Sequence, residues 1–410
     1  MLWQPALPEI YTRATPAQLA DRIAARRREL GPRLVILGHH YQTDEVLQHA
    51  DFTGDSLKLS QLAASEVQSR GAQFVIFCGV HFMAETADML TPDGTAVILP
   101  DLSAGCSMAD MADYDQAIHA WDTLTATLKK RHWKGRIIPV TYINSTAAIK
   151  AFVGQRGGIV CTSSNAPAVL QWAFAGGTQP KKKGEQIKVL FLPDQHLGRN
   201  TACKLGLDAD TDTALYDPRL AAGGTASDRL GGMTEAQLER AQVLLWAGHC
   251  SVHKLFRPEH IHQIRSAEKD LLKDQRTRIL VHPECSKEVV DLADDNGSTE
   301  YILRAIQSAA PGSSWAIGTE VHLVSRLARA AALRGAKVRI LSDCQCLCTT
   351  MYRIDQPHLL WVLDQLAEGK VPNRITVHPD ARRWALTAVD RMLALSPPAP
   401  AAVREAAMVD

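Results

Sequence analysis

The chain has almost no net charge and no long hydrophobic run. Its 410 residues include 45 Lys and Arg against 44 Asp and Glu, which gives a formal net charge of +1. No overall field therefore attracts nucleic acid or anionic lipid, although a local basic pocket is compatible with this balance. The longest strongly apolar runs, such as residues 74–80, are far shorter than the roughly 18 residues of a membrane span. We expect neither nucleic acid nor a membrane as a partner.

An export signal is also missing. The N-terminal segment MLWQPALPEI has no basic stretch followed by a continuous apolar core, so we expect a cytoplasmic protein. Apolar residues make up 46% of the chain and charged residues 22%, which excludes the disordered, collagen-like and coiled-coil classes. A single hydrophobic core serves at most roughly 250–300 residues, so a chain of this length is expected to form several domains.

Strand-like apolar runs alternate with helical stretches. Thr15 and Pro16 predict the start of an amphipathic helix that ends at Gly31. Beyond it, continuous apolar strands separated by helices are typical of α/β folds, in which helices cover both faces of parallel sheets. Ten runs have this pattern: RLVILG, QFVIFCG, AVILPD, RIIPVTYIN, GIVCTS, KVLFLPD, QVLLWAG, RILVHP, SWAIGTE and KVRILSD.

The runs fall into three sets with matching ends. In each set a strand runs into polar residues, a hydroxyl-bearing turn opens a helix, a third element leads to a histidine, and a fourth ends in cysteine. The hydroxyl follows the polar strand end by 15, 19 and 15 residues. This regularity predicts three similar α/β/α, Rossmann-like domains, related by pseudo-threefold symmetry, whose strand ends face one centre. The paired positions are Tyr41 and Ser56, Asn144 and Ser163, and Glu284 and Thr299.

The expected division of the chain begins with a helix in residues 1–30. The three units then span 31–125, 126–265 and 266–395, and a flexible tail spans 396–410. An insertion at about 205–237, rich in Asp, Gly and Thr, lengthens the second unit. It predicts an exposed loop or an additional small subdomain.

Nine cysteines in a chain without an export signal favour buried thiols and metal or redox ligands over disulfides. Three thiolates, one from each unit, would leave a coordination position open, whereas a structural zinc site takes four ligands. A 4Fe–4S cluster held by three cysteines keeps one iron able to bind a substrate oxygen as a Lewis acid. The candidate ligands are Cys106, Cys250 and one cysteine of the CxCxC group, for which we choose Cys348.

The remaining cysteines are weaker candidates. Cys78 and Cys161 lie inside apolar runs and are interpreted as buried thiols, and Cys203 is interpreted as inert. Cys285 directly follows a His-Pro-Glu turn, and its role stays ambiguous. Cys344 and Cys346 are alternative ligands or a redox-reactive pair, and the sequence leaves this open.

The hydroxyl-bearing turns and the polar strand ends bring binding and acid–base groups to the same level. A helix start favours anions, and although each turn alone is typical of a plain N-cap, three around one centre predict a pocket for phosphate and carboxylate groups. The strand ends suggest Glu284 as a base, or His39 and Tyr41 as a proton relay. Structural and functional roles are both open for three further histidines, His81, His196 and His322. The strand-end residues are His39, Tyr41, Tyr142, Asn144, His282 and Glu284.

A series of motifs runs through residues 31–354 in the order GHHYQ, ADFTGDS, FCGVHFMAET, PDLSAGCSMAD, VTYINSTA, CTSSNA, LPDQHLG, HCSVH, HPEC, GTEVH and CTTM. In these motifs the chain resembles the quinolinate synthase family, the iron–sulfur enzymes of NAD biosynthesis. Some members of that family have CxxCxxC where this chain has CxCxC, so Cys348 is chosen by the CxxM pattern that follows it.

The resemblance implies three similar α/β/α domains around a central 4Fe–4S cluster, ligated by Cys106, Cys250 and Cys348 with one iron open. It implies condensation of iminoaspartate with dihydroxyacetone phosphate to quinolinate, with iminoaspartate supplied by L-aspartate oxidase or aspartate dehydrogenase. Tyr41 and Glu284 would handle protons, beside a catalytic His39. The implied substrate-contacting residues are His39, Tyr41, Ser56, Tyr142, Asn144, Ser163, His282, Glu284 and Thr299.

Two other functions stay open. An iron–sulfur hydro-lyase acting on a different small diacid would use the same pocket residues. A zinc- or redox-responsive sensor would use the CxCxC group as its switch, without turnover. Such a sensor does not need the hydroxyl-bearing helix starts or the polar strand ends.

Overall fold

A computed structural model describes residues 4–221, 226–343 and 346–396 of the chain. Helix α2 (Pro16–Leu30) confirms the expected opening helix, because the Thr15 side chain accepts a hydrogen bond from the Gln18 backbone N–H and caps it. The helix ends at Gly31, whose φ of +55° is a conformation that glycine adopts readily. A short helix, α1 (Glu9–Thr12), precedes it. All of the expected tail after Ser396 lies outside the described residues.

The fold is α/β, with mainly parallel sheets, as the sequence predicts. The strands are β1 (Leu34–His39), β2 (Phe52–Gly54), β3 (Phe74–Cys78), β4 (Ala96–Ile98), β5 (Gly135–Tyr142), β6 (Ile159–Cys161), β7 (Gln186–Leu192), β8 (Thr213–Tyr216), β9 (Val243–Trp246), β10 (Arg278–Val281), β11 (Asp295–Asn296), β12 (Ser314–Gly318), β13 (Lys337–Ile340) and β14 (Arg374–Ile375). The first sheet has the order β14-β4-β3-β1-β2, the second β6-β5-β7-β9-β8 and the third β11-β10-β12-β13. Within the described residues, the strand pairings are parallel except that of β14 with β4.

The three sheets share a strand order. In each, the first strand of a set lies between the second and the third, and the fourth lies beyond the third, as in β2-β1-β3-β4, β6-β5-β7-β9 and β11-β10-β12-β13. Chain order reverses beside the first strand, and in such sheets a ligand crevice opens at the carboxyl ends of the strands there. His39 and Tyr142 are the last residues of β1 and β5, and His282 directly follows β10. An aromatic or imidazole side chain thus stands at the same place in all three sheets.

All ten predicted strand runs are strands in the structure. Almost every residue of β1, β5 and β7 is buried, which accounts for their continuous apolar character. The sequence prediction missed β2, β8, β11 and β14, whose two to four residues do not stand in a longer continuous apolar run.

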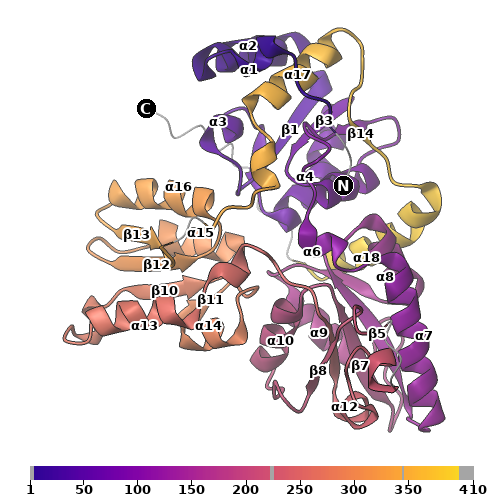
Figure 1. The fold of residues 1–410 in the computed structure, drawn as a ribbon. Coiled ribbons are helices and arrows are strands. Elements are labelled where there is room, and N and C mark those ends of the chain that lie inside the picture. Colours follow the sequence, from indigo (N-terminus) through magenta and orange to yellow (C-terminus); the bar gives the residue numbers. More distant parts are fainter. Residues whose placement is uncertain (1–3, 222–225, 344–345, 397–410) are drawn as a thin grey trace.

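Helices connect the strands and pack on the sheets (Figure 1). In the first unit these are α3 (Asp44–Leu47), α4 (Ser56–Arg70), α5 (His81–Leu90), α6 (Ser107–Asp110) and α7 (Tyr114–Lys130). In the second they are α8 (Ala147–Gln155), α9 (Ala166–Phe174), α10 (Gln195–Lys204), α11 (Ala226–Arg229) and α12 (Glu235–Arg240). Helix α13 (Pro258–Ala267) crosses the expected boundary at residue 265, and the third unit has α14 (Lys287–Leu292), α15 (Thr299–Gln307) and α16 (Val321–Ala332). Short 3₁₀ turns occur at Gly31–Arg33, His253–Leu255, Lys273–Gln275 and Met351–Arg353. No helix of the described part is long and apolar enough to cross a bilayer.

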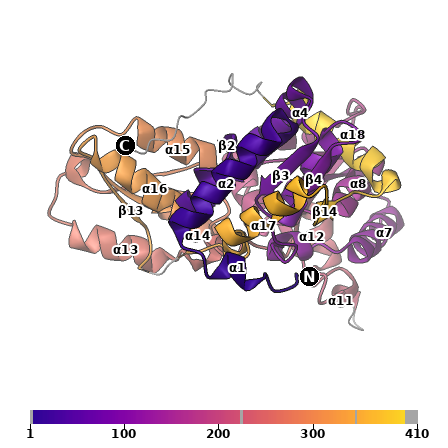
Figure 2. The ribbon, with the colours of Figure 1, turned by 90° about the horizontal axis from the view of Figure 1, so that it is seen from above.

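The last helices return to the first two sheets. Helix α17 (Gln356–Ala367) packs along α2, and α18 (Pro379–Ala394) packs on α8 and β6. Both views show α17 beside α2 and α18 beside α8, apart from the third sheet (Figures 1 and 2). Between these helices, β14 joins the edge of the first sheet next to β4. The segment after the 3₁₀ turn at Met351–Arg353, expected to be part of the third unit, therefore closes over the other two.

The insertion at about 205–237 is not simply an exposed loop, as one of the two expectations had it. Its strand β8 extends the second sheet in parallel beside β9. Tyr216 of β8 is fully buried, and its ring stacks on Trp246 with 5.4 Å between centroids. This aromatic pair anchors part of the insertion in the second core.

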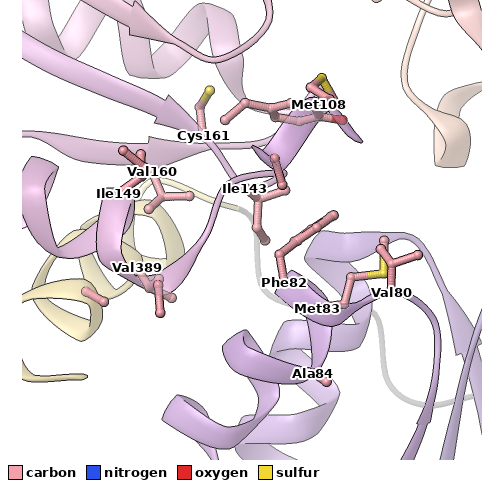
Figure 3. Close-up of a cluster of buried hydrophobic side chains, with 14 of the residues drawn as sticks. Val80, Phe82, Met83, Ala84, Met108, Ile143, Ile149, Val160, Cys161 and Val389 are labelled. Atoms are coloured by element: carbon pink, nitrogen blue, oxygen red, sulfur yellow. The ribbon is translucent and has the colours of Figure 1, made fainter. Parts of the chain in front are cut away.

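Apolar side chains fill the space where the first and second units meet (Figure 3). Phe82 of α5 lies opposite Ile143, which follows β5, Met83 lies beside Val80, and Val389 of α18 joins the same cluster. Cys161 lies among these apolar residues and is fully buried, as the sequence predicts for a thiol inside an apolar strand. This core holds the ends of β3 and β5 at a common level.

Candidate active site

One cavity of about 660 Å³, counted out to its mouth, lies where residues of the three sheets meet. Every site residue expected from the sequence contributes to its wall. These residues are His39, Tyr41, Ser56, Cys106, Tyr142, Asn144, Ser163, Cys250, His282, Glu284, Thr299 and Cys348. None of the described residues that line the cavity is Lys or Arg. Any anion held here therefore depends on dipoles and neutral donors.

The strand ends of the first and third units are built alike. The Tyr41 backbone N–H donates to His39 Nδ1 at 3.1 Å, and the Glu284 backbone N–H donates to His282 Nδ1 at 3.3 Å. Each bond joins a histidine to the residue two positions later, so the two loops present His-x-Tyr and His-x-Glu in the same local geometry. Burial lowers the pKa of both histidines, to about 3 in each case, so both rings are neutral near pH 7.

Glu284 is buried and held by two groups. The Tyr142 hydroxyl donates to its Oε1 at 2.6 Å, and His253 Nδ1 lies 2.9 Å from its Oε2. Burial by itself would raise the pKa of Glu284, but His253, His282 and these hydrogen bonds outweigh burial and hold the pKa below its usual value. The carboxylate form is therefore favoured.

Tyr41 is held in the protonated form. Burial, together with the charge of Glu284, raises its pKa well above the ordinary value of 10. Its hydroxyl lies 3.0 Å from the hydroxyls of both Thr299 and Thr319. The cavity thus contains a phenol that keeps its proton and a carboxylate that has lost one.

None of the three hydroxyl-bearing residues is the N-cap of its helix, although a single hydroxyl at a helix start is typical of a plain N-cap. Ser56 and Thr299 are the first residues of α4 and α15, whose caps are Asp55 and Ser298. The cap side chains accept the N–H groups of the third helical residues, at 2.9 and 3.3 Å. Ser163 lies in the turn before α9. Because the neighbouring residue does the capping, the hydroxyls of Ser56 and Thr299 stay beside the cavity.

The thiols of Cys106, Cys250 and Cys348 line the same cavity. Each accepts hydrogen bonds from the backbone N–H groups of residues two or three positions later. Burial raises the pKa of all three thiols, to about 12 for Cys106. Any two of the three sulfur atoms also repel each other when both are ionised as thiolates. A positive partner such as a metal is needed to hold three thiolates here.

A metal-binding set is present at the same place. Ligand atoms of Cys250, His253 and Glu284 all lie within 4.8 Å of one another. Thiolate, imidazole and carboxylate groups are common ligands of zinc and iron. The site can therefore hold a metal.

Comparison with known proteins agrees with this geometry. A family model described as quinolinate synthetase A protein matches residues 21–394. The quinolinate synthase of Acidobacterium capsulatum is 50% identical over 373 residues, which cover 91% of this chain and 92% of that protein. Those of Anoxybacillus flavithermus and Bacillus subtilis are each 48% identical, over 388 and 391 residues, covering 95% of this chain and 96% of each relative. The chain belongs to the quinolinate synthetase A family.

The other cysteines that the structure describes lie apart from the cavity wall of this family member. Cys78 is fully buried in β3, and burial raises its pKa to about 12. Cys285 is also fully buried, 3.8 Å from the Gly318 carbonyl oxygen. Cys346 lies 3.1 Å from the Ser342 hydroxyl, and Cys344 lies outside the described residues. No disulfide joins cysteines of the described part.

The three histidines left open by the sequence do not line the cavity of this quinolinate synthetase A family member. His322 Nδ1 lies 2.9 Å from Glu320 and its ring stacks on Tyr352. His81 lies 4.0 Å from Glu85, on the same helix. The contacts of His322 and His81 favour structural roles.

Sequence reasoning missed two residues of the family member's site, His253 and Thr319. His253 stacks on His282 with 4.4 Å between centroids, and its Nε2 lies 3.1 Å from the Thr319 hydroxyl. Both residues stand in motifs that were noted, HCSVH and GTEVH. Their positions depend on packing between sheets, and the strand-end pattern gives no information about that.

Proposed function

We propose that the protein is a quinolinate synthase, which condenses iminoaspartate with dihydroxyacetone phosphate and releases phosphate and water to give quinolinate for NAD biosynthesis. One observation carries the proposal: three cysteines, polar strand ends and hydroxyl-bearing helix starts from three sheets line a single cavity. The relatives named above are quinolinate synthases, and this chain matches each of them along nearly its whole length. Their names and the lining of this cavity point to the same chemistry.

The site residues are proposed to belong to three units related by pseudo-threefold symmetry, approximately 31–125, 126–265 and 266–395, the last of which ends in helices α17 and α18 that pack on the first two units. The common strand order supports this relation. The repeated N–H bonds to the thiols of Cys106, Cys250 and Cys348 support it independently. On this view each unit supplies one ligand to a central group.

The residues fit a 4Fe–4S cluster held by Cys106, Cys250 and Cys348. The three thiols are buried, accept backbone N–H groups and meet at one cavity, and no fourth cysteine of the described residues lines it. A cluster with three protein ligands would supply an open iron that acts as a Lewis acid toward a substrate oxygen. Sulfur ligands of this number match that cofactor better than a closed four-ligand zinc site.

Substrate anions are proposed to bind at the helix starts. Ser56 and Leu57 of α4 and Thr299 of α15 line the cavity, so the N-terminal ends of these helices face it. The unpaired N–H groups and the dipole of a helix start favour phosphate and carboxylate groups. Asn144 and Ser163 add neutral hydrogen-bonding groups from the second unit. This explains how a cavity lined without Lys or Arg could hold two anionic substrates.

Proton transfer is proposed for Glu284 and Tyr41. Glu284 is held as a carboxylate and suits a general base, whereas Tyr41 keeps its proton and suits a general acid. His39 lies beside Tyr41, with its ring 4.7 Å from the phenol ring; because its Nδ1 accepts the Tyr41 backbone N–H, the neutral ring carries its proton on Nε2 and can donate a hydrogen bond there. Two groups whose pKa values are driven apart can serve the imine and dehydration steps without exchanging roles.

The supply of iminoaspartate is proposed to come from an L-aspartate oxidase or an aspartate dehydrogenase. The proposed reaction consumes the imine as a substrate. It contains no oxidation step that could form the imine from aspartate, so another enzyme has to supply it. An imine hydrolyses in water, so the preceding enzyme would have to deliver it promptly.

The test is quinolinate formation by anaerobically purified protein whose iron and sulfide have been reconstituted. The protein receives iminoaspartate and dihydroxyacetone phosphate, and the product is identified by mass. Quinolinate above the no-enzyme background is expected, and Glu284→Gln at equal cluster loading should form at least about 100-fold less. A loaded protein without product would favour a hydro-lyase acting on another diacid. Zinc without labile sulfide would favour a sensor.

A further inference from the structure

Thr319 lies behind the cavity wall, where it touches two of its groups. It follows β12 and precedes Glu320, the N-cap of α16. The residue is fully buried and does not line the cavity. Its hydroxyl lies 3.0 Å from the Tyr41 hydroxyl and 3.1 Å from His253 Nε2. A buried hydroxyl costs free energy unless it is hydrogen-bonded, and here both partners belong to the site.

The Thr319 hydroxyl joins two hydrogen-bonded groups. On one side, Tyr41 also contacts the Thr299 hydroxyl, at 3.0 Å. On the other side, His253 contacts Glu284, which accepts from Tyr142. The two proposed proton-handling residues, Tyr41 and Glu284, are thus connected through Thr319 and His253.

One directed arrangement satisfies every group of this chain. Thr299 donates to the Tyr41 oxygen, Tyr41 donates to Thr319, and Thr319 donates to His253 Nε2. His253 Nδ1–H then donates to Glu284 Oε2. A hydroxyl has one proton and two lone pairs, so Thr319 can accept from Tyr41 and donate to His253 at once. Neither valine nor alanine could do this.

The fold itself does not require a hydroxyl at this place. In each unit one residue stands immediately before the N-cap of the helix that follows the third strand. The N-caps are Val80, Asp194 and Glu320. The corresponding residues are Gly79, Pro193 and Thr319. Only the third unit has a side chain there that forms hydrogen bonds, and only this one contacts Tyr41 and His253.

We propose that Thr319 is a positioning residue of the reaction, which acts through Tyr41 and His253. Its hydroxyl directs the Tyr41 phenol and holds the His253 ring with Nδ1 toward Glu284. It contacts no substrate, because it does not line the cavity. The inference rests on the proposed function, since Tyr41 and Glu284 matter as a pair only if both act on the substrates.

The test compares Thr319→Val, which keeps the shape and removes the hydroxyl, with Thr319→Ser, which keeps the hydroxyl. Both are assayed for quinolinate at equal cluster loading. Thr319→Val is expected to lower kcat on the order of tenfold or more with KM within about twofold, because small misplacements of catalytic groups cost rate rather than binding. Thr319→Ser should stay within about threefold of the native kcat. The control is Thr95→Val, since Thr95 is buried and its hydroxyl donates to the Ala72 carbonyl away from the cavity, and it should leave kcat unchanged.

A double-mutant cycle with Tyr41→Phe shows whether Thr319 acts through Tyr41. The activation free energy lost in the double variant should be clearly smaller than the sum of the two single losses, as expected for groups in one network. Additive losses, a Thr319→Val enzyme with native kcat, or a Thr319→Ser enzyme as slow as Thr319→Val would overturn the proposal. If Thr319→Val melts below the assay temperature, Thr319→Ala takes its place in every comparison. Failure of the proposed function shows separately, as absence of quinolinate from the loaded native protein.

Discussion

The Tyr142 hydroxyl donates a hydrogen bond of 2.6 Å to Glu284 Oε1 and so joins the end of β5 in the second sheet to the loop after β10 in the third. Both side chains are almost completely buried and line the cavity. A short bond to an ionised acceptor is among the stronger hydrogen bonds in proteins. It holds the proposed base in place and favours its carboxylate form.

Tyr142→Phe tests that relationship. Removing the hydroxyl leaves a buried carboxylate with one donor fewer, which costs about 1.5–3 kcal/mol. The pKa of Glu284 should rise, because the Tyr142 hydrogen bond is one of the causes that lower it. We therefore expect kcat/KM to fall and its acidic limb to move to higher pH, as measured by initial rates of quinolinate formation from pH 3 upward, because the pKa of Glu284 lies below its usual value of 4.5. An unchanged acidic limb would contradict the assignment of Glu284 as base.

His322 should make stability depend on pH. Its hydrogen bond with Glu320 raises the pKa of His322 above the usual 6.5, against burial and Arg326 and with support from Asp44. The folded state binds the proton more tightly than the unfolded state. The contribution is therefore complete below about pH 6.5 and is lost as the pH rises through the folded pKa.

The measurement is the free energy of unfolding in urea, for the native protein and for His322→Gln, from pH 5.5 to 9. The free energy of unfolding of the native protein should exceed that of the variant by up to about 1 kcal/mol at low pH, which is the upper end of the range for partly exposed ion pairs. A difference that grows toward high pH would show that the sign is wrong.

Asp364 of α17 connects this helix to α1 and α2 at the N-terminal end of the chain through hydrogen bonds. It accepts hydrogen bonds from the Tyr11 hydroxyl at 3.0 Å, from Arg22 at 3.2 Å and from Arg26 at 2.7 Å. Asp364→Asn removes the charge and turns one acceptor into a donor, so we expect a loss of about 1–3 kcal/mol in the free energy of unfolding.

The matched control for Asp364→Asn is Asp93→Asn. Asp93 is fully exposed and lies 3.8 Å from Arg382, so its substitution should lower the free energy of unfolding clearly less than Asp364→Asn does. Equal effects of the two substitutions, measured by urea unfolding at one pH, would show that the hydrogen bonds of Asp364 do not stabilise the fold.

Much of the fold follows from local sequence, because strands buried on both faces are continuously apolar. β1, β5 and β7 show this, and it also explains why polar residues at their ends meet, since the carboxyl ends of parallel strands lie at one edge of a sheet. His39, Tyr142 and Cys106 could therefore be expected at the cavity from their spacing and motifs alone. Their catalytic and binding roles remain predictions.

Other features depend on contacts between distant segments. Thr319 matters because Tyr41 and His253 come from two other units and reach its hydroxyl. The return of α18 onto α8 depends on a surface formed by residues more than 200 positions earlier. Strand β8 forms only because β9 offers an edge, although its residues TALY show no clear strand pattern. No local periodicity reports such pairings.

If one cysteine from each unit holds a 4Fe–4S cluster, replacing any one of the three should remove both iron and acid-labile sulfide, which are measured per chain. The native protein and Cys78→Ser, whose thiol lies in β3 away from the cavity wall, should both hold about four irons and four sulfides after anaerobic reconstitution. Cys106→Ser, Cys250→Ser and Cys348→Ser should each lose the cluster. Full loading and unchanged activity in any of those three variants would contradict the account.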